Sequence, residues 1–112
     1  EASSHINFKQ AVLEAGEGDT VLALKQLTPV RLLKNEFFKK VQEAESNCVP
    51  AEELATLLGK GRAKKGMFEG DLFEGELEIG QVSALIHKIQ PAAEIVQEIW
   101  DEYLRLSQYS LK

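Results

Sequence analysis

The most informative stretch of this chain runs from residue 66 to residue 81 and reads Gly-Met-Phe-Glu-Gly-Asp-Leu-Phe-Glu-Gly-Glu-Leu-Glu-Ile-Gly-Gln. Four glycines are interleaved there with large apolar side chains and with carboxylates. A plain linker has no use for so many apolar residues, whereas glycine lets one backbone approach another closely. The pattern therefore predicts a packed turn that lies against a ligand or against another part of a larger molecule.

Length and composition limit the classes of protein that need considering. A chain of 112 residues with 44% hydrophobic residues can form one domain with a modest core. Its formal charge of −5 argues against a nucleic-acid partner and against an anionic membrane surface. The single Cys48 excludes an internal disulfide and a cysteine zinc site, and indicates a reducing, cytoplasmic location.

Two expectations concern targeting and processing. No apolar run approaches the roughly 18 residues of a membrane span, and we expect no signal peptide. Because the sequence begins at Glu1 rather than at methionine, we expect a processed or truncated product.

Helical spacing dominates the first half of the chain. Asn7, or alternatively Ser4, caps an expected helix that ends before Gly16. Residues 20–24 are β-branched and apolar at their start, which predicts a short strand or an extended connector. Thr28-Pro29 resembles a capped helix start, and apolar residues follow it at helical spacing as far as residue 44.

The second half continues the same pattern. Pro50 opens a short helix that Gly59 closes, and residues 60–68 predict another helix. Apolar residues predict a further helix over residues 79–89, and Pro91 opens a terminal one. The sequence thus predicts a mainly α fold with six or seven helices and at most one short strand.

Clusters of charged residues offer little chemistry. His5 and His87 lie far apart in sequence and have no partners at ligand spacing. The five carboxylates of residues 69–78 fail the spacing of a calcium loop, so a solvated acidic loop is the better interpretation. A basic cluster precedes them, and complementary surface charge explains it more simply than a phosphate site does; it comprises Lys60, Arg62, Lys64 and Lys65.

Two pairs of polar residues are candidates for binding or for structure. Arg31 and Asn35 are four apart, so on a helix they share one face, where we interpret them as a structural clamp for a carboxylate or backbone carbonyls. Gly80-Gln81 opens an expected helix, where free N–H groups and the amide could meet a ring carbonyl or a phosphate. A packed helix start explains the second pair equally well. No nucleophile with a base, phosphate loop or dinucleotide motif is present.

Four ordered segments resemble the C-terminal third of the FMN-dependent nitronate monooxygenase family, once called 2-nitropropane dioxygenases and similar to flavin-dependent enoyl-acyl-carrier-protein reductases. The matching segments are Glu1-Ala2-Ser3-Ser4-His5 with Phe8-Lys9, Asp19-Thr20-Val21, Val30-Arg31 with Asn35, and Glu69-Gly70-Asp71 through Gly75 to Gly80-Gln81, followed by Leu85-Ile86 and Pro91. Ala84 stands where relatives commonly have glycine.

The resemblance implies a larger parent enzyme. In the family an FMN-binding (β/α)8 barrel precedes this region and carries the catalytic histidine, to which neither His5 nor His87 corresponds. The resemblance implies FMN in the parent and none bound to this fragment, with Gly80 and Gln81 as cofactor contacts and His5 and Lys9 at the pocket rim. It implies no catalytic residue and no metal ligand in this chain.

The resemblance also divides the chain into three regions. Residues 1–18 would be the last barrel-wall helix region, residues 19–75 a small helical domain, and residues 76–112 the C-terminal helices that pack back on the barrel. The parent would oxidise a nitronate or reduce an enoyl thioester with its flavin, whereas the fragment alone is predicted to be inactive.

The partners follow from the same reasoning. We expect the upstream barrel of the same polypeptide, and in the parent a small-molecule substrate, but no nucleic acid and no membrane. Excision would expose apolar faces, which predicts self-association of the fragment. The alternative function is a free-standing helical protein-interaction module.

Overall fold

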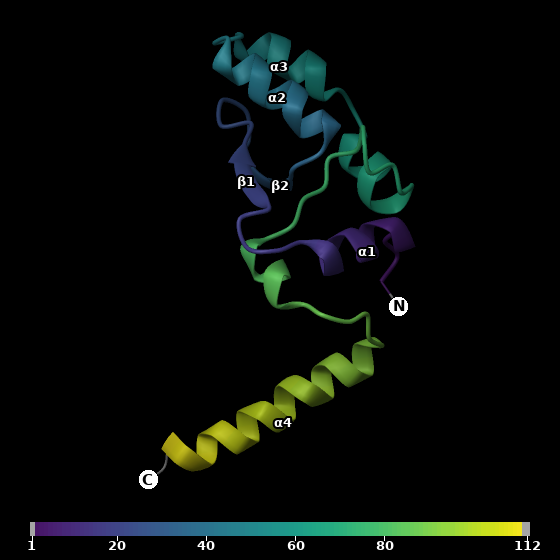
Figure 1. Ribbon diagram of the computed structural model, residues 1–112, viewed down its shortest axis with the longest axis vertical. Coiled ribbons are helices and arrows are strands. Elements are labelled where there is room, and N and C mark those ends of the chain that lie inside the picture. The colour runs from purple at the N-terminus through teal and green to yellow at the C-terminus, as the bar shows by residue number, and fades with distance from the viewer. Residues whose placement is uncertain (1, 111–112) are drawn as a thin grey trace.

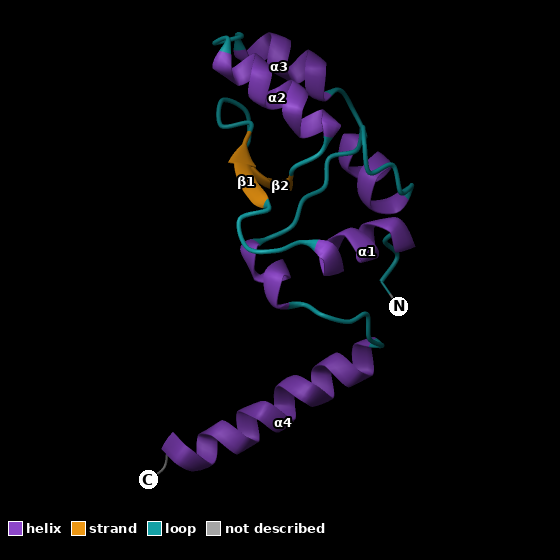
Figure 2. Cartoon of the chain, in the orientation of Figure 1, coloured by secondary structure: helices purple, strands orange, loops and turns teal. Residues whose placement is uncertain are grey.

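The computed structural model describes residues 2–110. Figure 1 shows a small body from which one long helix projects. The helices are α1 (Ile6–Glu14), α2 (Glu36–Ser46), α3 (Ala51–Leu58) and α4 (Ala92–Ser110), with the helical turns η1 (Lys64–Phe68) and η2 (Gln81–Leu85). The strands are β1 (Thr20–Ala23) and β2 (Val30–Leu33). The predicted mainly helical character is confirmed (Figure 2).

The two strands form an antiparallel hairpin in which Val21 lies opposite Leu32. The prediction of at most one strand is therefore wrong, and so is the helix start at Thr28-Pro29. Over four residues an apolar spacing of three fits a helix, but the same residues also suit a half-buried strand. Pairing with β1 decides the matter, because it satisfies the backbone groups of both strands and buries Leu32.

The glycine-rich segment, residues 66–81, supplies a third extended stretch beside β2. The Leu33 amide donates to the Leu77 carbonyl at 2.9 Å, and the Ile79 amide donates to the Arg31 carbonyl at 3.3 Å. A bridge also pairs Leu32 with Glu78. The segment is therefore part of the packed body, as its apolar residues predicted.

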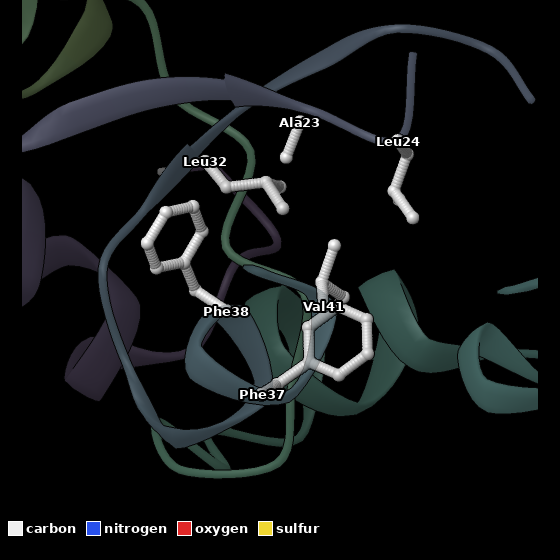
Figure 3. Packing of buried hydrophobic residues seen from close by; sticks show 6 residues of the cluster. All are labelled: Ala23, Leu24, Leu32, Phe37, Phe38 and Val41. Carbon is white, nitrogen blue, oxygen red and sulfur yellow. The ribbon is translucent and has the colours of Figure 1, made fainter. Parts of the chain in front are cut away.

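The main core lies between the hairpin and α2. Phe37 and Val41 of α2 are fully buried against Leu24 and Leu32 (Figure 3). α3 packs along α2 and adds Leu57 and Leu58 to the edge of this cluster. A second, smaller cluster joins the end of α1 to the glycine-rich segment through Ala15, Leu33 and Leu77.

The outer helices agree with the sequence in part. α3 begins after Pro50 and ends at Gly59, and α4 begins after Pro91, as predicted. The expected helix over residues 79–89 is wrong, because only η2 is helical there and residues 86–91 are not. Val82 and Leu85 are exposed, so no packing surface favours a longer helix at that place. No helix among residues 2–110 is long and apolar enough to cross a membrane.

Candidate functional site

His5 begins α1 and ties it to the glycine-rich segment. Its backbone carries the extended geometry of a helix cap, and its Nδ1 accepts from the Asn7 amide at 3.0 Å. His5 is therefore the cap, and the predicted caps Asn7 and Ser4 are wrong. The His5 amide donates to the Met67 carbonyl at 2.7 Å, and the Asn7 side chain donates to the Gly70 carbonyl at 3.0 Å. A Cβ on Gly70 would collide with the imidazole ring.

Lys9, the other residue predicted at a pocket rim, lies one turn along α1. Its amide donates to the His5 carbonyl at 3.1 Å, and the residue is half-buried. His87, in contrast, lies exposed in the connection between η2 and α4. The two histidines therefore belong to separate parts of the fold.

Gly66 and Gly75 allow two parts of the glycine-rich segment to cross. A Cβ on Gly75 would collide with the Gly66 Cα and with the Asp71 carbonyl. A Cβ on Gly66 would lie 2.8 Å from the Leu77 Cδ2 atom. These glycines are therefore required by packing between parts of this chain, which answers part of the question left open by the sequence.

Arg31 and Asn35 do not share a helix face, because Arg31 belongs to β2 and Asn35 caps α2. That placement corrects the predicted geometry. The Arg31 guanidinium donates to the Thr20 carbonyl at 3.1 Å. The Asn35 side chain donates to the carbonyls of Leu72 and Gly75 at 2.9 and 2.8 Å, and its Oδ1 accepts from the Phe38 amide at 2.9 Å. Each residue thus fixes backbone, although the two act on different segments.

Arg62 is a structural residue whose role the sequence did not reveal. Its guanidinium donates to the carbonyls of Leu57, Leu58 and Glu74, at 2.8, 2.9 and 3.0 Å. It also lies 4.6 Å from the centroid of the Phe37 ring. In sequence Arg62 is one member of a basic cluster, and only the folded chain separates it from Lys60, Lys64 and Lys65. Lys65 and Lys64 lie near Asp71 and Glu69, at 3.5 and 3.8 Å.

The carboxylates of the glycine-rich segment occupy different environments. Glu76 is only 6% exposed, and burial together with the neighbouring Glu78 carboxyl raises its pKa to about 7. The Glu74 backbone amide lowers the pKa of Asp71, and Lys40 lowers that of Glu74. Within residues 2–110 no three His, Cys, Asp or Glu side chains are placed to hold a metal ion.

Gln81 lies beside an open cleft of about 570 Å³ between η2 and the loop that follows α1, and Gly80 directly precedes it in the chain. Gln81 lines this cleft, and so do Gly16, Gly18, Thr20 and Leu85. Gly80 is exposed, and a Cβ added to it would meet nothing within 4 Å. The cleft is lined by Gln81 and also by Glu17, so it offers a side-chain amide beside a carboxylate.

The candidate residues do not converge on one site. The cleft at Gln81 lies beyond the C-terminal end of α1, whereas His5 lies at the N-terminal end. The nine residues of α1 separate these places by about 13 Å. The predicted cofactor contact at Gly80-Gln81 and the predicted pocket rim at His5 and Lys9 are therefore two separate places. Each would contact a ligand or another part of a larger protein independently.

The comparisons with known proteins agree on one relationship. A sequence model described as nitronate monooxygenase matches residues 1–102. Among solved structures, FabK from Thermotoga maritima matches 95% of this chain with a TM-score of 0.78 and 31% identity. A mutant of the same FabK matches 95% of it with a TM-score of 0.74 and 27% identity. No match was found among the curated proteins. This chain covers 33% and 31% of the two FabK chains, about a third of each.

Proposed function

Because the chain belongs to the nitronate monooxygenase family, we propose that it is the C-terminal part of a longer FMN-dependent oxidoreductase. The observation that carries this proposal is the match of 95% of the chain to only 33% of FabK. The remaining two thirds of such an enzyme would contain the barrel that binds the flavin.

The chemistry that we propose for the parent is a redox step on a small substrate, either a nitronate or an enoyl thioester. FMN, when bound, supplies the electron transfer. The sequence shows no nucleophilic side chain paired with a general base, and the two histidines lie in separate parts of the fold. We therefore propose that the chain has no activity by itself and that its residues serve to position or enclose the substrate.

The residues at Gly80 and Gln81 fit one contact with a flavin but not a complete site. Gln81 lines the cleft, where its amide could donate to a carbonyl of the ring, whereas Glu17 in the same lining disfavours an anionic phosphate. The cleft is open, so this chain does not enclose a ligand of that size. An upstream barrel would have to supply the opposite wall and most of the contacts.

The proposed partner of this chain is thus the upstream part of its own polypeptide. Regions 1–18 and 76–112 would lean on that part, and region 19–75 would cover the substrate side. Region 76–112 contains exposed Val82, Leu85 and Ile86, which suit an apolar partner surface. The exposed single Cys48 supports a reducing, cytoplasmic location.

Flavin binding tests this proposal directly. We expect the chain alone to be colourless and to leave the fluorescence of added FMN unchanged in a titration. A polypeptide that extends upstream by about two hundred residues, the usual size of a barrel less this part, should purify yellow. In that longer protein, Gln81→Ala should weaken FMN binding several-fold, whereas Gln108→Ala on α4 should not. Tight stoichiometric FMN binding by the chain alone would contradict the proposal.

The upstream coding sequence distinguishes the alternative, a free-standing helical interaction module. An initiator codon directly before Glu1 would favour that module. An upstream reading frame of alternating strands and helices would exclude it.

A further inference from the structure

Glu76 is a buried acid without a cation of its own. Only 6% of the residue is exposed, and no ion pair in the part of the chain that the structure describes includes it. Arg62 acts on it, but the Arg62 guanidinium already donates to three backbone carbonyls and lies 3.5 Å from the Glu74 carboxylate. Burying a carboxylate without a dedicated cation is costly, so the fold favours a protonated Glu76.

A second acid, Glu78, lies beside Glu76 on the same face of the extended stretch. Side chains two residues apart along extended backbone point to the same side. Glu78 bridges to Leu32, and cross-strand partners share a face, so both acids lie on the side of the main core. Leu77 and Ile79 point the other way and join the second cluster. Two carboxyl groups therefore meet at the edge of the main core.

We propose that Glu76 and Glu78 share one proton in the folded chain, and that losing this proton releases residues 77–79 from β2. In the closed form the Glu76 carboxyl group donates to the Glu78 carboxylate. When that proton passes to water, two carboxylates remain side by side, and one of them is buried. Release of the strand relieves their repulsion and lets the Glu76 carboxylate reach water.

The attachment of this stretch suits a local release. Two backbone hydrogen bonds, of 2.9 and 3.3 Å, join residues 77–79 to β2. Gly75 stays fixed at one end, because its carbonyl accepts from Asn35 at 2.8 Å. Gly80, at the other end, is exposed and has open space around its Cβ position, so the stretch opens from that end. Because release uncovers the buried Leu77, the open form remains the minority.

The surrounding charges place the response near neutral pH. Burial raises the pKa of Glu76 to about 7; the hydrogen bond and charge of Glu78 add to this effect, and Arg62 opposes it. Three cations of neighbouring elements are held elsewhere, by other carboxylates or by a backbone carbonyl: Lys40 of α2, Lys65 of η1 and Arg31 of β2. A raised pKa favours the closed form below the usual glutamate value, and this advantage is lost as pH rises through about 7.

The release also reaches the cleft. Residues 77–79 lead directly into Gly80 and Gln81, and Gln81 lines the cleft. Opening of the stretch would therefore displace Gln81, and in the longer protein it would weaken the proposed flavin contact as pH rises. This consequence rests on the proposed function, whereas the release itself is a property of the 112-residue chain and is tested without flavin.

Amide hydrogen exchange, corrected for its intrinsic dependence on pH, tests the release. We expect the Leu33 and Ile79 amides to exchange at least about tenfold faster at pH 8 than at pH 5, with little dependence on dilute urea. The amide of Val41, fully buried in α2, should exchange more slowly and depend more strongly on urea, because it opens only in global unfolding. Exchange of Leu33 and Ile79 at the rate of Val41, with the same urea dependence, would overturn the local release.

Two isosteric variants test the shared proton. In Glu76→Gln, exchange of the Leu33 and Ile79 amides should differ less than about twofold between pH 5 and pH 8, because the group no longer titrates. Glu78→Gln removes the like charge but leaves Glu76 buried, so the midpoint of the response should fall by at least about half a pH unit.

The matched control is Glu69→Gln in the same segment, whose carboxylate lies near Lys64 and whose loss should leave the midpoint unchanged. A full pH response in Glu76→Gln would overturn the role of Glu76. An unchanged midpoint in Glu78→Gln would overturn the shared proton.

Discussion

At the scale of single residues, Gly75 determines how the glycine-rich segment packs. Its backbone lies against Gly66, its amide donates to the Asp71 carbonyl at 3.1 Å, and its carbonyl accepts from Asn35 at 2.8 Å. Three segments therefore meet at a position where no side chain fits.

We expect Gly75→Ala to lower the free energy of unfolding by about 1–3 kcal/mol, because the new methyl group forces backbone apart. Urea denaturation followed by circular dichroism measures the change. The control is Gly80→Ala, since Gly80 has a φ of −83° and open space around its Cβ position. Equal stability of the two variants would contradict the close crossing.

Glu76 gives the stability of the chain an unusual dependence on pH. Its pKa rises from 4.5 to about 7 in the folded chain, chiefly through burial. The folded state therefore keeps a proton that the unfolded state has already lost, and stability falls as pH rises between these two values. Asp71 and Glu74 have lowered pKa values, so the stability they contribute is lost only as pH falls into the acid range.

We expect the chain to be about 1–3 kcal/mol less stable at pH 8 than at pH 4.5 through this group. Glu76→Gln should abolish most of that loss, and Glu53→Gln on the exposed side of α3 should leave it unchanged. Urea denaturation at fixed protein concentration, repeated between pH 4.5 and pH 8, measures the change in the free energy of unfolding. A wild-type chain whose stability rises steadily from pH 4.5 to 8 would show that the Glu76 carboxyl is not buried as described.

At the scale of elements, contacts with a distant segment decide which of two possible caps begins α2. Thr28-Pro29 has the residues of a helix start, yet α2 begins after Asn35. Asn35 both caps the helix and donates to two carbonyls of the glycine-rich segment, about forty residues further along the chain. A cap that satisfies local and distant backbone at once outcompetes one that satisfies local backbone alone.

We expect Asn35→Ala to lower the free energy of unfolding by about 2–3 kcal/mol, because it removes the cap and two part-buried hydrogen bonds to the Leu72 and Gly75 carbonyls. Asn35→Asp keeps the oxygen that caps α2 but loses the N–H groups that donate to the two carbonyls. If the cap contributes more, the aspartate variant should lose less stability than the alanine variant. If the two hydrogen bonds contribute more, it should lose as much stability as the alanine variant, or more. Thermal unfolding of the three chains decides between these contributions. A loss under about 0.5 kcal/mol for alanine would refute both.

At the scale of the whole molecule, α4 makes the structure more elongated than a compact domain with the same number of residues. The radius of gyration is 17.4 Å, whereas a compact domain of this length has about 13 Å. The long dimension of 56 Å reflects the projection of α4 from the body (Figure 1). A helix that buries no apolar face gains little from tertiary packing.

We expect amide hydrogen exchange to divide the chain accordingly. In a dilute monomeric sample, the amides of α2 around the buried Phe37 and Val41 should exchange slowly, and those of α4 should exchange nearly as fast as in a free peptide. Equal protection of α2 and α4 in a sample shown to be monomeric would contradict this division.

The sequence by itself determined the features that local pattern encodes. Pro50, Gly59 and Pro91 placed the limits of α3 and the start of α4, because caps and breakers act on neighbouring residues. The ordered segments from Glu1 to Pro91 also indicated the family to which the chain belongs.

Tertiary structure alone decided the features that depend on residues far apart in sequence. β2 became a strand because β1 and residues 77–79 lie on either side of it. His5 caps α1 with its ring packed against Gly70. Arg62 points away from the neighbouring lysines and donates to three backbone carbonyls. The physical reason is that hydrogen bonds and close packing are satisfied in space, whereas periodicity and capping signals report only on the next few residues of the chain.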